Sequence, residues 1–310
     1  MEYRQLGKTS LLVSTLGFGA SPLGDFFGRI DPAEGEAAVH FAVDHGINYF
    51  DVSPYYGLTL AESRLGKALE GRRQQVVLAT KCGRYGIDQF DFTAARITAS
   101  IEESLSRLRT DYVDLLQAHD VEFGEVSQIV AETLPALRAL QKQGKARYIG
   151  ITGYSLKNLM EIASRVEVDT ILTYCRHNLM VTDIDTAMVP FAKQRGIGIV
   201  NASPLHSGVL TERGTPDWHP ASTKVRNAGR GVVTLCRDHG VDVSQVALRF
   251  CLDHVDVATT LVGMSSREHV KANLRCLTVN NDPELLSKIH EIVSSTQDGH
   301  WPSGRPENYG

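Results

Sequence analysis

The sequence lacks the features that mark secreted, membrane-spanning and disulfide-stabilised proteins. Its five cysteines are an odd number, scattered without a CxxC pair, which favours reduced thiols over a disulfide framework. Long apolar runs are also missing. No stretch approaches the ~18 uninterrupted apolar residues of a membrane-spanning helix, and the opening MEYRQLGKTS has no apolar signal core. We therefore expect a cytoplasmic protein without a membrane partner.

An excess of basic charge is absent too. Lysine and arginine total 32 against 36 acidic residues, a formal net charge of -4, so a nucleic-acid partner is not expected. Hydrophobic residues make up 42% and charged residues 22% of the 310 residues, which is typical of globular proteins. The length would allow one large or two medium domains. Because no linker or low-complexity segment interrupts the chain, we expect a single domain over residues 1–310.

One pattern recurs along the chain: an amphipathic stretch, a polar residue, a glycine and then a short apolar strand. It is seen in FAVDHGINYFD, LQKQGKARYIGIT and FAKQRGIGIVNAS. Glycine after the last turn can close a helix in the left-handed conformation. A continuous apolar strand directly afterwards fits a parallel sheet that is buried on both faces. Strands are predicted at eight places, near residues 15, 48, 77, 113, 147, 170, 198 and 259.

This alternation predicts the fold class. Most intervals between the strands hold one helical pattern, such as 94–107, 127–143 and 184–195, and strict β-α alternation leads to a parallel sheet. Eight units over this length favour a closed (β/α)8 TIM barrel of the α/β class over an open doubly wound sheet. A short N-terminal β-hairpin at 3–13 and an extra C-terminal helix at 283–297 are also expected. Active sites of such barrels lie just past the C-terminal ends of the strands.

Four chemically active side chains follow three consecutive strands. Asp51 ends the strand NYFD with Tyr56 five residues later, Lys81 ends VVLATK, and His119 follows YVDLLQA. A buried lysine needs a counter-charge, which Asp51 can supply. Lysine beside a phenol lowers the pKa of that phenol, so Tyr56 would exchange a proton with a substrate oxygen that His119 orients. Each residue alone has a structural explanation, but all four at matching barrel positions favour a catalytic site.

The spacing of these four residues resembles the catalytic tetrad of the aldo-keto reductase superfamily. The resemblance implies a (β/α)8 oxidoreductase that binds a nicotinamide cofactor without a Rossmann domain. It makes Tyr56 the proton donor or acceptor, Lys81 its pKa modulator, Asp51 the partner of Lys81, and His119 the group that orients the substrate oxygen. Hydride would pass directly between cofactor and substrate. No metal is expected.

The resemblance also implies cofactor-binding residues. NASPLHSGVLTERG (201–214) resembles the pyrophosphate loop, and LVGMSSREHVKAN (261–273) resembles the adenosine segment, at a helix N-terminus that favours an anion. NADP-preferring members place a lysine and an arginine where this chain has Gly263 and His269, so NAD is expected over NADP; Arg267 could still reach a phosphate. The full set is Gly19, Ala20, Thr152, Tyr174, Ser203, Leu205, Ser207, Gly263, Ser265, Arg267, His269 and Asn273.

Two departures from the superfamily pattern concern the nicotinamide pocket. Thr152 and Gly153 stand where Ser-Asn is common, and Tyr174 stands where Gln is common. Thr152 can still donate to the carboxamide and Tyr174 can stack on the ring. The loss of the asparagine amide leaves carboxamide recognition open.

Other segments resemble more narrowly the L-galactose dehydrogenases of plants and related L-fucose/L-galactose 1-dehydrogenases. These segments are GFGASPLG, FDVSPYYG, ATKCGRYG, HDVEFG, GITG, DWHPAS and WPSG. The resemblance implies oxidation of L-galactose, or of L-fucose, at C1 to the lactone. A sugar pocket needs convergent polar groups and an aromatic surface. The candidates on the predicted mouth loops are Tyr55, Arg84, Asp120, Glu122, Trp218, His219 and Trp301.

Two alternative functions stay open. An NAD(P)H-dependent aldehyde or ketone reductase would work in the opposite direction, and the many polar side chains of the mouth argue against it. A non-catalytic nicotinamide-sensing subunit, as in potassium-channel β-subunits, uses the same barrel, but no apolar helix surface stands out for a partner. We expect a small-molecule sugar as the binding partner and a monomer or weak homo-oligomer.

Overall fold

The computed structural model describes residues 1–215, 219–294, 296 and 299–309. Within these residues, eight parallel strands close into a barrel in the order β10-β3-β4-β5-β6-β7-β8-β9. The strands are β3 (Leu16–Gly19), β4 (Tyr49–Asp51), β5 (Val77–Cys82), β6 (Val113–Ala118), β7 (Ala146–Gly153), β8 (Thr170–Tyr174), β9 (Gly198–Ala202) and β10 (Thr259–Gly263). All eight predicted positions are occupied, so the predicted TIM barrel is confirmed. The predicted hairpin is also present, with β1 (Tyr3–Gln5) antiparallel to β2 (Leu12–Ser14).

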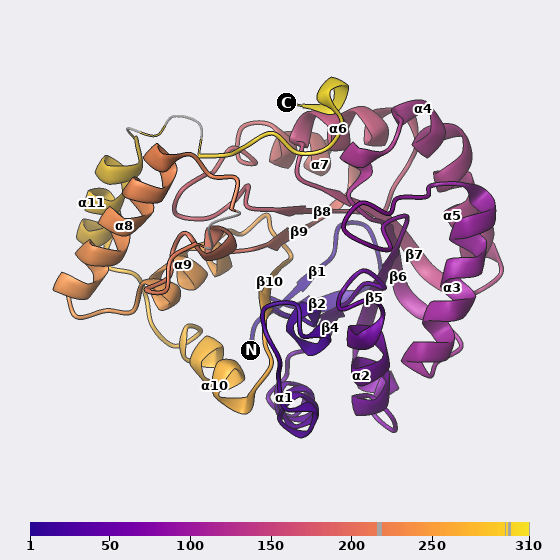
Figure 1. Ribbon diagram of the computed structural model, residues 1–310, viewed down its shortest axis with the longest axis horizontal. Helices are drawn as coiled ribbons and strands as arrows, with labels where there is room; N and C mark the ends of the chain where they lie inside the picture. The colour runs from indigo at the N-terminus through magenta and orange to yellow at the C-terminus, as the bar shows by residue number, and fades with distance from the viewer. Residues whose placement is uncertain (216–218, 295, 297–298, 310) are drawn as a thin grey trace.

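Helices surround the barrel and connect its strands (Figure 1). They are α1 (Pro32–Asp44), α2 (Leu60–Ala68), α3 (Ala94–Leu108), α4 (Val126–Gln128), α5 (Leu134–Lys142), α6 (Leu156–Arg165), α7 (Met188–Arg195), α8 (Thr223–Asp238), α9 (Val243–Leu252), α10 (Arg267–Arg275) and α11 (Pro283–Ser294). The helical pattern predicted at 127–143 is divided by a π-helical stretch, Ile129–Thr133. The helical pattern predicted at 184–195 begins later, at Met188. The predicted extra C-terminal helix is α11.

The glycines of the recurring pattern close their helices as predicted. Gly46, Gly144 and Gly196 have φ values of 85°, 80° and 67°, in the left-handed region that suits glycine. Gly196 is the C-cap of α7, and its amide donates to the carbonyls of Ala192 and Lys193. The chain can therefore turn from each helix into the next strand within a few residues.

Side-chain alternation along the strands separates the barrel interior from the surrounding helices. In β5, Val77 and Ala79 belong to an interior apolar cluster, which the hairpin residues Leu6, Leu11 and Val13 also join. Leu78 and Cys82 belong instead to the cluster between barrel and helices. Because the side chains of a strand alternate between its two faces, the inward row of β5 continues to Lys81. The same alternation carries Asp51 of β4 and Gln117 of β6 into the interior.

A second group of elements lies beside the barrel. The interval from β9 to β10 holds two helices, α8 and α9, and α8 packs against α11 around a separate apolar cluster. Figure 1 shows α8 and α11 together at the left, and the chain end near α6. All five cysteines are buried free thiols, as predicted. Among the described residues, no helix has the length and apolar character needed to cross a membrane.

Candidate active site

A buried ion pair forms the floor of the candidate site. The Lys81 ammonium pairs with Asp51 and also donates to the Val52 carbonyl at 3.0 Å. Gln117 donates from its side-chain amide to the other Asp51 oxygen at 3.1 Å. Burial lowers the pKa of Lys81, but the nearby Asp51 carboxylate and Tyr56 phenol together outweigh it, and the net pKa is raised. Lys81 therefore keeps its charge, and Asp51 holds it as predicted.

Tyr56 lies above this pair in the loop after β4. The Lys81 ammonium is 5.0 Å from the centre of the Tyr56 ring, and the Tyr56 amide donates to the Ser53 carbonyl at 3.1 Å. The next residue, Gly57, has a φ of 62°, and a Cβ added there would lie 2.0 Å from the Gly24 carbonyl oxygen. A side chain at position 57 would collide with the backbone of the neighbouring loop. The close approach of these two loops therefore sets the position of Tyr56.

The pKa of Tyr56 differs from the prediction. Lys81 acts to lower it, but burial is the largest influence and raises it, and the carboxylates of Asp51 and Asp120 add to the increase. The net result raises the pKa of Tyr56 to about 12. The expectation of a lowered pKa is therefore wrong, because desolvation of the phenolate outweighs one neighbouring ammonium. The phenol carries its proton at neutral pH.

His119 is a neutral hydrogen-bond donor beside Tyr56. The Tyr55 amide donates to the Ser53 hydroxyl oxygen at 3.1 Å, and that hydroxyl lies 3.0 Å from Nδ1 of His119. The Ser53 hydroxyl can donate to Nδ1, and in that tautomer the ring proton lies on Nε2, the nitrogen on the side of Asp120. Burial, followed by the charges of Lys81 and Arg84, holds the pKa of His119 well below its usual value. The ring stands edge-on to Tyr56, with centroids 5.8 Å apart.

Three of the predicted substrate residues adjoin this group. Arg84 pairs with Asp120 at 2.5 Å and lies over the Tyr55 ring, 4.0 Å from its centre. Asp120 in turn lies 3.7 Å from Nε2 of His119, and the Tyr55 and His119 rings are 6.1 Å apart. The structure therefore brings a charged pair and an aromatic face beside the tetrad, which are the groups expected of a sugar pocket.

Glu122 is buried deeper. Its Oε1 accepts from the Tyr154 amide at 2.9 Å, the Ser303 hydroxyl at 3.3 Å and the Tyr174 hydroxyl at 3.4 Å. Burial, and next the charge of Asp120, raises the pKa of Glu122 to about 8. The carboxyl group therefore carries a proton over much of the neutral pH range and anchors Ser303 of the C-terminal tail.

The remaining substrate candidates form a separate aromatic group. Trp301 stacks on Tyr154 with ring centroids 5.2 Å apart, and His219 meets Trp301 edge-on at 4.9 Å. Tyr154 is also 5.5 Å from Tyr174, which links this group to Glu122. Trp218 lies outside the described residues. The predicted substrate residues thus divide into a group at the tetrad and a group around Trp301 of the C-terminal tail.

The residues predicted for the cofactor lie on the ends of the barrel strands, on the loops after them and on α10. Gly19 and Gly263 are register partners on β3 and β10, and the Ala20 amide donates to the Asp51 carbonyl at 2.9 Å. Thr152 accepts from the Asp120 amide at 3.1 Å through its hydroxyl. Tyr174 ends β8.

The predicted pyrophosphate loop has an unusual backbone. Ser203, His206 and Ser207 have φ values of 59°, 48° and 51°. Among the described residues, no acceptor is found for the backbone amides of Leu205 and Ser207. Backbone amides in left-handed turns form concave sites that suit anions. The loop also carries the hydroxyls of Ser203 and Ser207, of which that of Ser207 lies 3.1 Å from the Cys175 thiol. The loop therefore fits the diphosphate of a dinucleotide.

The N-terminus of α10, which was expected to bind an anion of the cofactor, is partly occupied by side chains of the protein. The Arg267 amide donates to the Glu34 carboxylate at 2.9 Å, and the Arg267 guanidinium lies 3.5 Å from the same oxygen. The His269 amide donates to the Ser266 hydroxyl at 3.2 Å, and Ser265 lies 3.3 Å from the His269 ring. Two first-turn donors are therefore occupied by the chain itself, and a carboxylate stands at this helix end. Asn273 lies farther along α10.

Two residues of the site were missed in the sequence. Gln117 binds Asp51, and Ser53 orients His119. Period-two alternation in LLQAH places Leu115, Gln117 and His119 on one face of β6 and its extension, so Gln117 could have been identified. Nothing in the sequence marks Ser53, because its role depends on the fold of the loop after β4.

Comparison with known proteins gives a consistent result. Residues 15–294 match the Aldo/keto reductase family. The chain is 44% identical to an L-galactose dehydrogenase of Arabidopsis thaliana, over 99% of each chain. It is 30% identical to a D-threo-aldose 1-dehydrogenase of Pseudomonas sp, over 91% of this chain and 94% of that one. Among solved structures, an aldo-keto reductase from Bacillus halodurans in its holo form has a TM-score of 0.78 and 29% identity, covering 94% of this chain and 96% of that chain.

Proposed function

The chain belongs to the aldo/keto reductase family, and we propose that it is an NAD-dependent sugar dehydrogenase that oxidises L-galactose at C1 to the lactone. The observation that carries this proposal is the group of Tyr56, the buried Lys81–Asp51 pair and the neutral His119. The 44% identity to the Arabidopsis enzyme over nearly the whole chain supports the choice of sugar. L-Fucose, which lacks only the 6-hydroxyl of L-galactose, is proposed as a second substrate.

In the proposed mechanism, Tyr56 accepts the C1 hydroxyl proton of the sugar, and His119 orients the C1 oxygen by a hydrogen bond. A bound nicotinamide would supply the acceptor for the hydride that leaves C1 of the sugar. His119 donates from Nε2 to the C1 oxygen, and the phenolate form of Tyr56 removes the C1 hydroxyl proton. The Lys81 charge favours that phenolate, while Asp51 and Gln117 keep the ammonium in place. The products are the lactone, the reduced nicotinamide and one proton.

The preference for NAD is proposed from the charges at the adenosine end. Glu34 engages both the amide and the guanidinium of Arg267, so the cation that could have reached a 2′-phosphate already has a partner. A phosphate dianion would also be repelled by the Glu34 carboxylate. Ser203, Leu205 and Ser207 would hold the diphosphate, which both cofactors share.

The proposed sugar contacts are Arg84, Asp120 and Tyr55. A charged pair beside an aromatic face can hydrogen-bond sugar hydroxyls and cover the apolar side of the ring. Trp301 and His219 would act through the loop and tail that they hold. We further propose that residues 1–310 work as one domain, as a monomer or weak homo-oligomer in the cytoplasm; the five buried thiols agree with a reducing compartment.

The test measures initial rates of reduced-nicotinamide formation with L-galactose, L-fucose, D-galactose and D-arabinose, each with NAD and NADP. We expect L-galactose with NAD to have the highest kcat/KM. The matched control is Tyr56→Phe, which should lose turnover and still bind NADH, as expected for a group that acts in the transition state. A wild-type protein that binds NADH but oxidises none of these sugars would contradict the proposal, as would an active Tyr56→Phe variant.

A further inference from the structure

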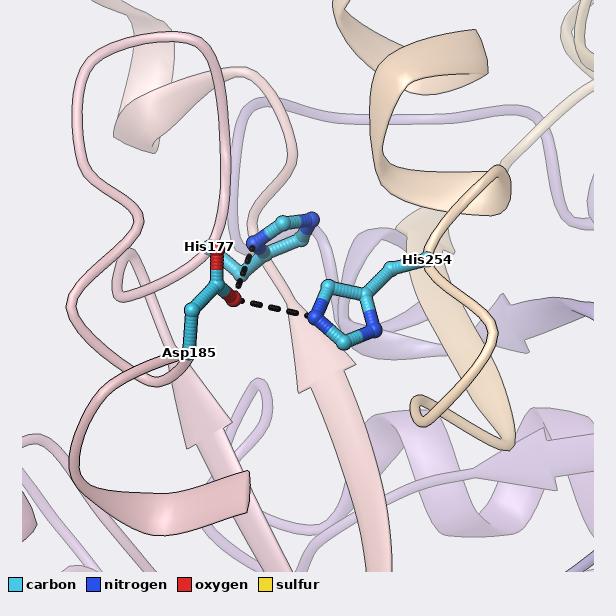
Figure 2. Close-up of side chains that lie close together, drawn as sticks. All are labelled: His177, Asp185 and His254. Atoms are coloured by element: carbon cyan, nitrogen blue, oxygen red, sulfur yellow. Dashed lines mark hydrogen bonds and ion pairs between the residues drawn. The ribbon is translucent and has the colours of Figure 1, made fainter. Parts of the chain in front are cut away.

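A cluster of possible metal ligands lies outside the candidate active site (Figure 2). Among the described residues, a search for three or more His, Cys, Asp or Glu side chains that could share one ion finds His177, Asp185 and His254, whose ligand atoms all lie within 4.8 Å of one another. His177 follows β8, Asp185 lies in the loop before α7, and His254 follows α9. Two loops therefore converge at this point, the β8–α7 loop with His177 and Asp185 and the α9–β10 loop with His254.

The imidazole ring of His177 is buried, and its two nitrogens have no hydrogen-bond partner among the described residues. The relative exposure of the residue is 3%. One face of the ring stacks on Phe250 at 5.2 Å. Nδ1 is directed at the Asp185 carboxylate, 3.6 Å away (Figure 2). Buried polar groups in folded proteins are normally satisfied, so this nitrogen is available to a ligand between the two side chains.

The spacing suits a small cation. Two ligand atoms that each lie about 2.1 Å from a tetrahedral zinc ion are about 3.4 Å apart. Asp185 Oδ1 lies 3.6 Å from His177 Nδ1 and 2.9 Å from His254 Nε2. One distance is slightly longer and the other shorter than this ligand–ligand distance. Two imidazoles and one carboxylate are donors that zinc and its late first-row neighbours prefer. We propose that His177, Asp185 and His254 bind one divalent zinc-type cation, with water completing the coordination.

The three proposed ligands differ in their exposure to solvent. The side chains of Asp185 and His254 are 44% and 14% exposed, so an ion can enter from solvent and keep bound water. His177 forms the buried wall. Because the three ligands come from two loops, binding would join the loop after β8 to the loop before β10 and would stabilise the folded chain over the unfolded one.

A hydrogen bond competes with the ion. The Asp256 amide donates to Nδ1 of His254 at 3.1 Å, so without an ion the ring proton lies on Nε2 and is donated to Asp185. Metal binding at Nε2 moves that proton to Nδ1 and displaces the Asp256 amide. Residue 256 is partly exposed, so water can take over this amide. The cluster can therefore change from a hydrogen-bonded to a metal-bound form without unfolding.

The experiment titrates the full chain, first stripped with a chelator, with Zn²⁺ in competition with a chromogenic chelator. Asp185→Ala and His254→Ala remove partly exposed ligands, so both variants should fold; melting in zinc-free buffer checks this. His290→Ala, an exposed histidine on α11, is the matched control. We expect one Zn²⁺ per wild-type and control chain, affinity at least about tenfold weaker in both ligand variants, and a zinc-dependent rise in Tm that only those two lose.

Co²⁺ provides a second measurement on the same proteins. An intense visible absorption band at one equivalent, present in the wild type and control and lost in Asp185→Ala and His254→Ala, would support low-coordinate binding at this cluster. Equal zinc affinity in all four proteins, or no stoichiometric binding to the wild type, would overturn the proposal. If the His290→Ala control also bound zinc more weakly, the zinc would be bound by surface histidines in general, and the proposal would likewise be overturned.

Discussion

The pH dependence of sugar oxidation should report the pKa of Tyr56. Burial raises this pKa to about 12, so only about one phenol in 10⁴ is ionised at pH 8. If the phenolate removes the C1 proton, kcat/KM should rise about tenfold per pH unit from pH 7 to pH 10. The assay stops at pH 10: folding raises this pKa above its ordinary value of 10.0, so Tyr56 begins to destabilise the folded state above that pH.

Removing the Lys81 ammonium gives a second test of how the pKa of Tyr56 controls the pH dependence of kcat/KM. Lys81→Met alone would leave the buried Asp51 without a cationic partner, at a cost of about 3–5 kcal/mol of stability, so Lys81→Met/Asp51→Asn is the better variant. Without the Lys81 charge, the pKa of Tyr56 should rise further and the rate should fall across the whole pH range. The control is Asp51→Asn alone, which keeps the Lys81 side chain but removes its counter-charge. The measurement is kcat/KM for L-galactose at each pH, with activity at pH 7 remeasured after each exposure.

Two results would refute this reasoning. A flat profile from pH 7 to pH 10, or a plateau starting near pH 7, would mean that the reacting base is not a phenol with a raised pKa. An unchanged profile in the double variant would mean that Lys81 does not influence the base. In the second case the buried pair would have only a structural role.

Three further predictions follow from individual contacts. Gln117→Leu removes the amide that holds Asp51 and should lower kcat about tenfold while the Kd for NADH stays unchanged; an unchanged kcat would show that Lys81 alone positions Asp51. Glu34→Gln should raise kcat/KM with NADP relative to NAD by about tenfold, since it removes the carboxylate that pairs with Arg267 and would repel a phosphate; an unaltered ratio would mean that the 2′-phosphate does not bind beside Glu34. Burial lowers the pKa of His206 to about 4 from 6.5, so the unfolded chain takes up a proton first as the pH falls. Between pH 6.5 and about 4, this residue should lower the free energy of unfolding, measured in urea, by about 1.4 kcal/mol per pH unit. The decrease should be smaller in His206→Asn, and an equal decrease in both proteins would exclude a contribution of His206.

Much of the barrel could be predicted from local patterns. The sequence places an apolar strand at each of the eight barrel positions, and helix-closing glycines such as Gly144 and Gly196 mark where helices turn into strands. Both signals depend on neighbours within a few residues. The π-helical stretch at 129–133 and the second helix between β9 and β10 were not predicted. Both depend on packing against segments that lie farther away in the chain.

The candidate site was only partly predictable. Asp51, Lys81 and His119 were identified because they end parallel strands, whose C-terminal ends meet at one mouth. The direction of the Tyr56 pKa was predicted wrongly. The sequence shows that a lysine lies near but does not show how far the phenol is removed from water.

By itself, the sequence determined the eight-stranded barrel, the residues that would meet at its mouth, and the family resemblance that the whole-chain comparisons confirm. Only the tertiary structure decided the sign of the Tyr56 pKa shift, the partner of Arg267 and the meeting of His177 with His254. Residues 34 and 267 are 233 positions apart, and residues 177 and 254 lie on separate loops. Strand periodicity is a local property of the chain, whereas desolvation and charge pairing depend on distances that exist only once the barrel has closed.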